Sequence, residues 1–90
     1  MRIRFSNELD KELQRIKKKD PLLAKRIEKQ LLLFILNPKH PSLRLHKLSG
    51  KLDNMWSISI TKNIRMLYLL LSADEAYFFD IGTHDEVYRK

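Results

Sequence analysis

Two neighbouring strand patterns in the second half of the chain constrain the fold more than any other feature. Trp56-Ser-Ile-Ser-Ile-Thr61 alternates apolar and polar residues, which predicts a strand with one face against a core. Arg65-Met-Leu-Tyr-Leu-Leu-Leu71 follows within a few residues and predicts its partner strand. The two segments together predict an antiparallel hairpin whose polar face is open to solvent.

The loop of this hairpin decides where the Arg65 side chain points. Directly paired residues share a face of a sheet, so an even loop would turn the guanidinium into the core, where an unpaired charge is strongly unfavourable. We therefore expect an odd loop, such as residues 62–64 with a bulge. This register places Arg65 on the same face as Ser57, Ser59 and Thr61.

The first half of the chain carries helical patterns. Residues 2–5 alternate and predict a short strand, after which Ser6 is expected to cap a helix that ends near residue 19. Asp20-Pro21 marks the start of a second helix and Asn37-Pro38 its end, so the pair should form an antiparallel hairpin. Residues 31–36 are apolar on every side, and we expect the fold, rather than another chain, to enclose them.

The order of the elements predicts the fold class. Residues 43–48 also alternate and predict a strand that carries Arg44 and His46 on its polar face. The order is then β-α-α-β-β-β(-β) with a short C-terminal helix, which predicts an α+β fold with a helical hairpin on one face of a twisted antiparallel sheet. A chain of 90 residues can bury one core, so we expect residues 1–90 to form a single domain with the other sheet face left for function.

Histidine 84 lies at a corner between a predicted strand and a predicted helix. The apolar run 77–81 indicates a buried strand that Gly82 stops, and Thr83 with Glu86 matches the capping box that opens a helix. The N-H groups at such a helix start can bind phosphate, and the positive end of the helix dipole favours a neutral imidazole that accepts a proton. His84 is therefore a candidate general base, with a solvated polar residue as the alternative.

Charge and composition narrow the choice of partners. The net charge is +7, with 13 Lys or Arg against 5 Asp or Glu in residues 1–50 and 5 against 6 in residues 51–90. This excess favours a polyanion or an acidic protein partner, although exposed cations also serve solubility alone. The sequence has no cysteine, and no apolar stretch reaches the roughly 20 residues that span a bilayer, so we expect a cytoplasmic protein without membrane attachment.

Four segments together resemble toxins of the RelE/ParE superfamily, and most closely its RelE/StbE and YafQ-like branch. They are His46-Lys-Leu-Ser-Gly-Lys51, Trp56-Ser-Ile-Ser-Ile-Thr61, Asn63-Ile-Arg-Met-Leu-Tyr68 and Asp80-Ile-Gly-Thr-His-Asp-Glu-Val-Tyr88. The resemblance covers nearly the whole chain. It implies a RelE-like toxin of a type II toxin-antitoxin system, an endoribonuclease (mRNA interferase) that cleaves mRNA in the ribosomal A site and is held inactive by a small acidic antitoxin that wraps it.

In such toxins the RNA 2'-hydroxyl attacks the adjacent phosphate, which leaves a cyclic phosphate and a free 5'-hydroxyl. That chemistry needs a base, an acid and cations, and it requires neither a metal nor another cofactor. A metal site at His84, Asp85 and Glu86 is also disfavoured because adjacent helical residues point in different directions.

The resemblance assigns roles to particular residues. The catalytic ones are His84, its aromatic companion Tyr88, a second histidine His46, and Arg65, whose planar guanidinium would stabilise the phosphate. The residues expected to hold the RNA backbone are Lys47, Lys51, Lys62 and Asn63.

Each assignment has a structural alternative. Lys47 and Lys51 could be merely solvated, His46 structural, Tyr88 a packing residue, and Arg65 an ion-pair partner of Asp80 or Asp85. Two departures from the family's pattern keep the function open. Ser59 stands where the family usually has Arg or His, and Asn63 where YafQ-like toxins have an acid. The competing functions are a ParE-like, non-catalytic inhibitor of DNA gyrase and an inactive RelE-fold binding protein.

Overall fold

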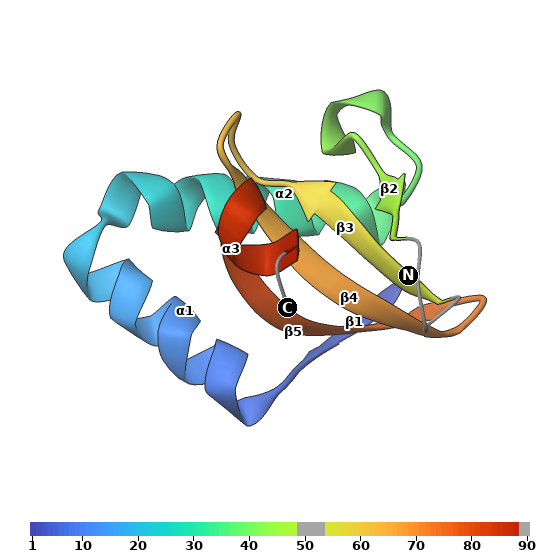
Figure 1. The fold of residues 1–90 in the computed structure, drawn as a ribbon, viewed down its shortest axis with the longest axis horizontal. Coiled ribbons are helices and arrows are strands. Elements are labelled where there is room, and N and C mark those ends of the chain that lie inside the picture. Colours follow the sequence, from blue (N-terminus) through green and yellow to red (C-terminus); the bar gives the residue numbers. More distant parts are fainter. Residues whose placement is uncertain (49–53, 89–90) are drawn as a thin grey trace.

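The computed structural model describes residues 1–48 and 54–88. Five strands form one sheet in the order β1-β5-β4-β3-β2, with α2 behind it and α3 in front of it in Figure 1. The predicted α+β class is confirmed. The elements are β1 (Arg2–Phe5), α1 (Asn7–Lys19), α2 (Pro21–Leu36), the 3-10 helix η1 (Pro41–Leu43), β2 (His46–Lys47), β3 (Met55–Ser59), β4 (Ile64–Ser72), β5 (Glu75–Thr83) and α3 (His84–Tyr88).

The sheet is mixed, so the prediction of a fully antiparallel sheet is wrong at one edge. β1 runs parallel to β5, with Arg2 opposite Glu75 and Phe5 opposite Phe78. Alternation of apolar and polar residues specifies the face of a strand but not its direction. The direction of β1 is set by the two helices that follow it, because they carry the chain across the sheet before the hairpin strands begin.

Ser6 and Asp20 cap the N-termini of α1 and α2, as the sequence predicts. The Ser6 hydroxyl accepts a hydrogen bond from the Leu9 N-H at 3.1 Å, and the Asp20 carboxylate accepts one from the Leu23 N-H at 3.2 Å. Each bond satisfies a backbone donor that has no partner within its helix. Asp20 also ends α1, so the two helices diverge from one residue (Figure 1).

The core lies between α2 and the sheet. Phe34 of α2 packs edge-on against Tyr68 of β4 and Phe78 of β5, with ring centroids 5.0 and 5.4 Å apart. Burial raises the pKa of Tyr68 from 10.0 to about 12, because the phenolate would lose its hydration there. The contacts of these three rings show which face of the sheet packs against α2.

The end of α2 is only partly enclosed, which corrects the expectation for residues 31–36. Leu31 and Phe34 are buried, whereas Leu32 is 53% exposed and Leu36 is 83% exposed. A helix on a sheet covers only the stripe that faces the strands. The apolar residues on the outer side of α2 therefore remain on the surface.

The predicted strand 43–48 is wrong except at residues 46–47, which form the two-residue strand β2. A 3-10 helix comes first, with Pro41 in its first turn and the His40 Nδ1 accepting a hydrogen bond from the Ser42 N-H at 3.1 Å. Arg44 then turns the chain in the left-handed region, with φ of 45°. These local bonds start the turn before a strand can form.

No helix in the described residues combines the length and the apolarity that a membrane crossing needs.

Candidate active site

The β3–β4 hairpin has the register that places Arg65 away from the core. Ser59 lies opposite Arg65, and the Ile60 N-H donates to the Ile64 carbonyl at 2.8 Å, which leaves residues 61–63 in the loop. The odd loop is confirmed, although it lies one residue before the range suggested by the sequence. Arg65 therefore shares a face with Ser57 and Ser59.

This face is covered rather than open, which corrects the sequence-based expectation. Ser57 is fully buried and Ser59 is 8% exposed. On this face α3 packs on β4 and β5, and its Tyr88 hydroxyl is hydrogen-bonded to that of Ser57. Phe78 and Tyr68 point to the helix α2, so the neighbouring residues of the same strands point to α3 on the opposite face.

Gly82 permits this close approach of α3. The predicted end of the strand at Gly82 is wrong, since β5 continues through Thr83. A Cβ atom on Gly82 would lie 3.0 Å from the Glu86 Oε1 and 3.4 Å from the Val87 Cγ1. The glycine therefore lets the helix lie against the strand without displacing the Glu86 side chain.

The predicted capping box is confirmed at the start of α3. The Thr83 N-H donates to the Glu86 carboxylate at 2.7 Å, and the Glu86 N-H donates to the Thr83 hydroxyl at 3.2 Å. These bonds use two backbone donors at the corner, and α3 is only five residues long. Arg44 and Arg65 line the same cavity as His84 and bring positive charge to it in addition to the helix end.

The Arg65 guanidinium is held from two sides. Its Nε donates to the Ser57 hydroxyl at 3.0 Å, and its Nη2 donates to the Arg44 carbonyl at 2.6 Å. The Ser57 hydroxyl is in turn hydrogen-bonded to the Tyr88 hydroxyl at 2.6 Å. One buried serine thus links the cation of the hairpin to the aromatic ring of α3.

The Tyr88 ring lies between two histidines. Its centroid is 4.2 Å from that of His84 and 5.9 Å from that of His46, and both contacts are edge-on. The His84 side chain is 73% exposed, and its Nδ1 lies 3.9 Å from a carboxylate oxygen of Asp85. Both imidazoles are therefore placed around one ring, and that of His84 is open to a ligand.

The four predicted catalytic residues line one cavity of about 290 Å³, together with Arg44 and Leu45. They come from β2, β4 and α3, so the fold brings together groups that are far apart in the sequence. The lining combines two guanidinium groups, two imidazoles and a phenol. Such a set can bind a phosphate and move protons at its oxygens. No group of three or more His, Asp or Glu residues within 1–48 and 54–88 is arranged to hold a metal ion.

The predicted RNA-binding residues are dispersed. Lys62 lines a second cavity of about 470 Å³ that shares Arg44 and Arg65 with the first. Asn63 is exposed in the hairpin loop, and its N-H donates to the Thr61 hydroxyl. Lys47 does not line either cavity, and its Nζ lies 5.8 Å from the centre of the Trp56 ring. Lys51 lies outside the described residues.

Two residues of the site carried no prediction of their own. Ser57 was expected only as part of a polar strand face, yet it holds both Arg65 and Tyr88. Its place in the alternating pattern, on the same face as Arg65, is the signal that could have found it. The carbonyl of Arg44 also binds Arg65, but a left-handed backbone at a non-glycine residue has no clear signal in the sequence.

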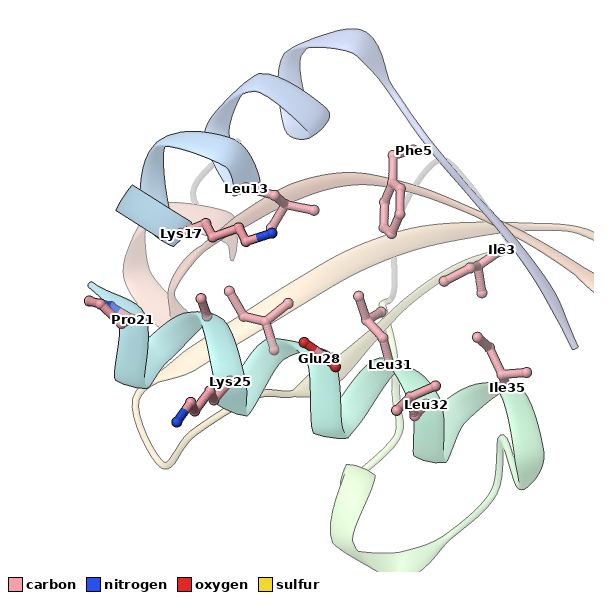
Figure 2. Close-up of a pocket in the computed structure, with 12 residues that line it drawn as sticks. Ile3, Phe5, Leu13, Lys17, Pro21, Lys25, Glu28, Leu31, Leu32 and Ile35 are labelled. Carbon is pink, nitrogen blue, oxygen red and sulfur yellow. The ribbon is translucent and has the colours of Figure 1, made fainter. Parts of the chain in front are cut away.

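A separate apolar groove lies on the helix side of the molecule. It has a volume of about 620 Å³ and runs between α1, α2 and β1 (Figure 2). Its apolar lining includes Ile3, Phe5, Leu13, Leu31, Leu32 and Ile35. Lys17, Lys25 and Glu28 also line it, with Lys17 and Lys25 on facing helices (Figure 2).

Several solved structures share this fold. A YoeB/ParE toxin from Agrobacterium tumefaciens matches with a TM-score of 0.78 and 15% identity, over 93% of this chain and 99% of that one. YafQ in the E. coli DinJ-YafQ complex matches with a TM-score of 0.77 and 18% identity, over 98% of this chain and 99% of that one. YoeB in the heterotetrameric YoeB-YefM complex from Staphylococcus aureus matches with a TM-score of 0.75 and 19% identity, over 93% and 97%.

No protein-family model matches the sequence, and no curated protein matches it. At 15–19% identity, the structural matches establish a shared fold. The chemistry of the site has to be argued from its own residues.

Proposed function

We propose that this chain is the toxin of a type II toxin-antitoxin pair and an endoribonuclease that cleaves mRNA on the ribosome. The observation that carries the proposal is the shared cavity of His84, His46, Arg65 and Tyr88. The likeness to YoeB and YafQ structures supports it at the level of the fold. Residues 1–90 would act as one toxin domain in the cytoplasm.

The reaction requires groups that this cavity can supply. His84 would take the proton of the 2'-hydroxyl, whose oxygen then forms a bond to the adjacent phosphorus. The bond from phosphorus to the 5'-oxygen breaks, and His46 would give a proton to that oxygen. The products are a 2',3'-cyclic phosphate and a 5'-hydroxyl. One P-O bond forms and one breaks, and the proton taken by His84 is matched by the proton that His46 gives, so the step needs no oxidant.

Arg65 would stabilise the charge that develops on the phosphate oxygens. Its Nε and Nη2 are each held by a hydrogen bond, so the guanidinium is already oriented before the substrate arrives. Donors fixed in advance stabilise a transition state better than mobile ones, since they need no reorganisation during the reaction. Tyr88 would hold the two imidazoles apart through its ring contacts.

The two departures from the family's pattern are compatible with this division of work. The Ser59 hydroxyl donates to the Thr61 carbonyl at 2.9 Å, so it serves the loop of the hairpin. Asn63 lies in the same loop, outside the residues that line the smaller cavity. The acid and base roles therefore fall to the histidines around Tyr88.

The partner would be a small acidic antitoxin. Related folds have been solved with antitoxins, as in the DinJ-YafQ and YoeB-YefM complexes. On this chain, the apolar groove between α1 and α2 would bury the apolar face of a partner helix, and Lys17 and Lys25 in its lining would attract acidic residues. The net charge of +7 also disfavours a second copy of the same chain as the occupant.

Expression of the wild type and of His84→Ala in a bacterial host tests the function. The proposal predicts growth arrest with cut messages for the wild type and the loss of both in the variant. Arrest that persists in His84→Ala, with signs of DNA damage, would instead indicate gyrase inhibition. The absence of arrest in both would indicate an inactive binding protein.

A further inference from the structure

The second, larger cavity has the composition of a binding site for an anion. Its volume is about 470 Å³, and it lies beside the candidate active site, with Arg44 and Arg65 in the lining of both. Its other cations are Arg26 and Lys29 from α2 and Lys62 from the hairpin loop. None of the described residues that line it is acidic. A concave surface lined by five cations has a strong positive potential, which favours binding of an anion.

The walls of this cavity are held in place by buried hydrogen bonds. Gln30 is 4% exposed, and its amide donates to the Ser59 carbonyl at 2.9 Å and to the Ser42 carbonyl at 3.4 Å. Arg26 is fixed as well, since its Nε donates to the Ile60 carbonyl at 3.1 Å. These bonds tie α2 to the 3-10 helix and to the hairpin, so the backbone around the cavity and the Arg26 side chain are positioned before a ligand binds.

We propose that this cavity binds a second phosphodiester of the RNA strand, next to the one that is cleaved. The proposal rests on the proposed function and names how its substrate is held. Arg65 stands between the two cavities, with its Nε bonded towards Ser57 and its Nη2 bonded to the carbonyl of Arg44. A strand that crosses Arg65 would place consecutive phosphates on its two sides. Two adjacent phosphate sites would fix the position and direction of the strand relative to the catalytic groups, without reading its sequence.

Titration with short deoxyoligonucleotides tests this assignment, because they lack the 2'-hydroxyl and cannot be cleaved. A deoxythymidine dimer has one phosphodiester and a trimer has two. We expect the trimer to bind the wild type several-fold more tightly than the dimer in an NMR titration. The salt dependence of log Kd should be steeper by about 0.7 for the trimer, which is the value for one further contact on a single strand. The trimer should also shift the Arg26 Nε-H and Thr61 N-H resonances.

A pair of charge-matched double variants gives the control. In Lys29→Ala/Lys62→Ala, the trimer should bind no more tightly than the dimer, while the affinity for the dimer changes by less than about twofold. In Lys17→Ala/Lys25→Ala, which loses the same charge beside the apolar groove, the advantage of the trimer should persist. If the advantage is absent in the wild type, survives in the first variant or is lost in both, the proposal is wrong.

Three further readouts separate this proposal from others. If the wild type cleaves messages on ribosomes but shows no advantage for the trimer, the proposed function stands and the second phosphate site does not. If the trimer shifts Arg26 and Thr61 but neither oligonucleotide shifts the His46 and His84 rings, the phosphate site stands without the nuclease. Weaker binding of Lys29→Ala/Lys62→Ala to ribosomes that carry no message would place ribosomal RNA in the cavity and overturn the assignment to the message.

Discussion

At the scale of residues, the hydroxyl of Ser57 organises the candidate active site. It accepts a hydrogen bond from the Arg65 Nε and shares another with the Tyr88 hydroxyl, at 3.0 and 2.6 Å. A serine hydroxyl has one donor and two acceptor positions, so it can serve both neighbours at once. Ser57 therefore acts as a positioning residue that couples the phosphate-binding cation to the ring between the histidines.

Replacing this hydroxyl should affect catalysis more than folding. We expect Ser57→Ala to lower kcat for message cleavage on ribosomes by about 10-fold or more, because the guanidinium and the ring lose their common anchor. The KM should change little. The loss of buried hydrogen bonds should lower the free energy of unfolding by about 1–2 kcal/mol. Steady-state cleavage assays and urea denaturation measure the two effects.

Ser59→Ala is the matched control for this prediction. Ser59 lies on the same face of the same strand and is also buried, but its hydroxyl donates to the Thr61 carbonyl. The control should lose similar stability and keep kcat within about threefold of the wild type. Equal losses of kcat in the two variants would mean that Ser57 has only a structural role.

The position of Arg65 could be predicted from the sequence, whereas its partners could not. Alternation and the cost of a buried charge together determine its face of the sheet. The burial of Ser57 depends on α3 folding over the strand, and this is a tertiary contact. The left-handed backbone of Arg44 has no sequence signal, since most such positions are glycine or asparagine.

At the scale of elements, α3 is the part on which the geometry of the site depends most. It carries His84 and Tyr88, and it is held by its capping box and by close packing on Gly82. A short helix has little stability of its own, so these contacts decide its position. A substitution at Gly82 should therefore move His84 and Tyr88, although Gly82 does not line the cavity.

Gly82→Ala should loosen α3. The added methyl group would lie 3.0 Å from the Glu86 Oε1 and 3.2 Å from the Glu86 Cβ, so the carboxylate must move from its bond to the Thr83 N-H. We expect a loss of about 1 kcal/mol, similar to the loss of a helix cap, and faster hydrogen exchange of the Val87 amide. If the contact with the carboxylate is the cause, part of this loss should disappear on a Glu86→Ala background. A fully additive double variant would contradict the explanation.

Elements with local signals could be predicted better than those without. The caps at Ser6, Asp20 and Thr83 are local hydrogen-bonding patterns, and the structure has all three. Residues 43–48 were predicted to form a strand because apolar and polar residues alternate there. Instead, His40 and Pro41 begin a 3-10 helix that extends to Leu43. Local propensity is outweighed where neighbouring side chains bond to the backbone.

At the scale of the whole molecule, two candidate binding surfaces lie on opposite sides of the sheet. The candidate active site is on the face that α3 covers, and the apolar groove is on the side of α1 and α2 (Figures 1 and 2). The sequence predicted the helix layer behind the sheet, but it wrongly left the opposite face open, where α3 packs on β4 and β5. It could not predict the groove, because the divergence of the two helices and the parallel pairing of β1 are properties of the assembled fold.

The groove should be the docking surface for the acidic partner. Leu32 lines it and is 53% exposed, so Leu32→Asp would place a carboxylate where an apolar and acidic helix must pack. We expect this change to weaken binding of the proposed acidic antitoxin by at least about 10-fold, or 1.4 kcal/mol. Isothermal titration calorimetry measures the affinity.

Leu71→Asp provides the comparison, because Leu71 is 48% exposed and lies on β4, outside the residues that line the groove. This variant should bind the partner as the wild type does. Equal affinities for all three proteins would show that the partner docks elsewhere, and circular dichroism would check that both variants remain folded.

The chemistry of the cut ends tests the central claim most directly. Purified chain would be incubated with ribosomes that carry a defined message, with excess EDTA present, and the fragments analysed by mass spectrometry. We predict a 2',3'-cyclic phosphate on the upstream fragment and a 5'-hydroxyl on the downstream one, with both products lost in His84→Ala and Arg65→Ala. Fragments with 5'-phosphate ends, or cleavage that persists in both variants, would contradict the account.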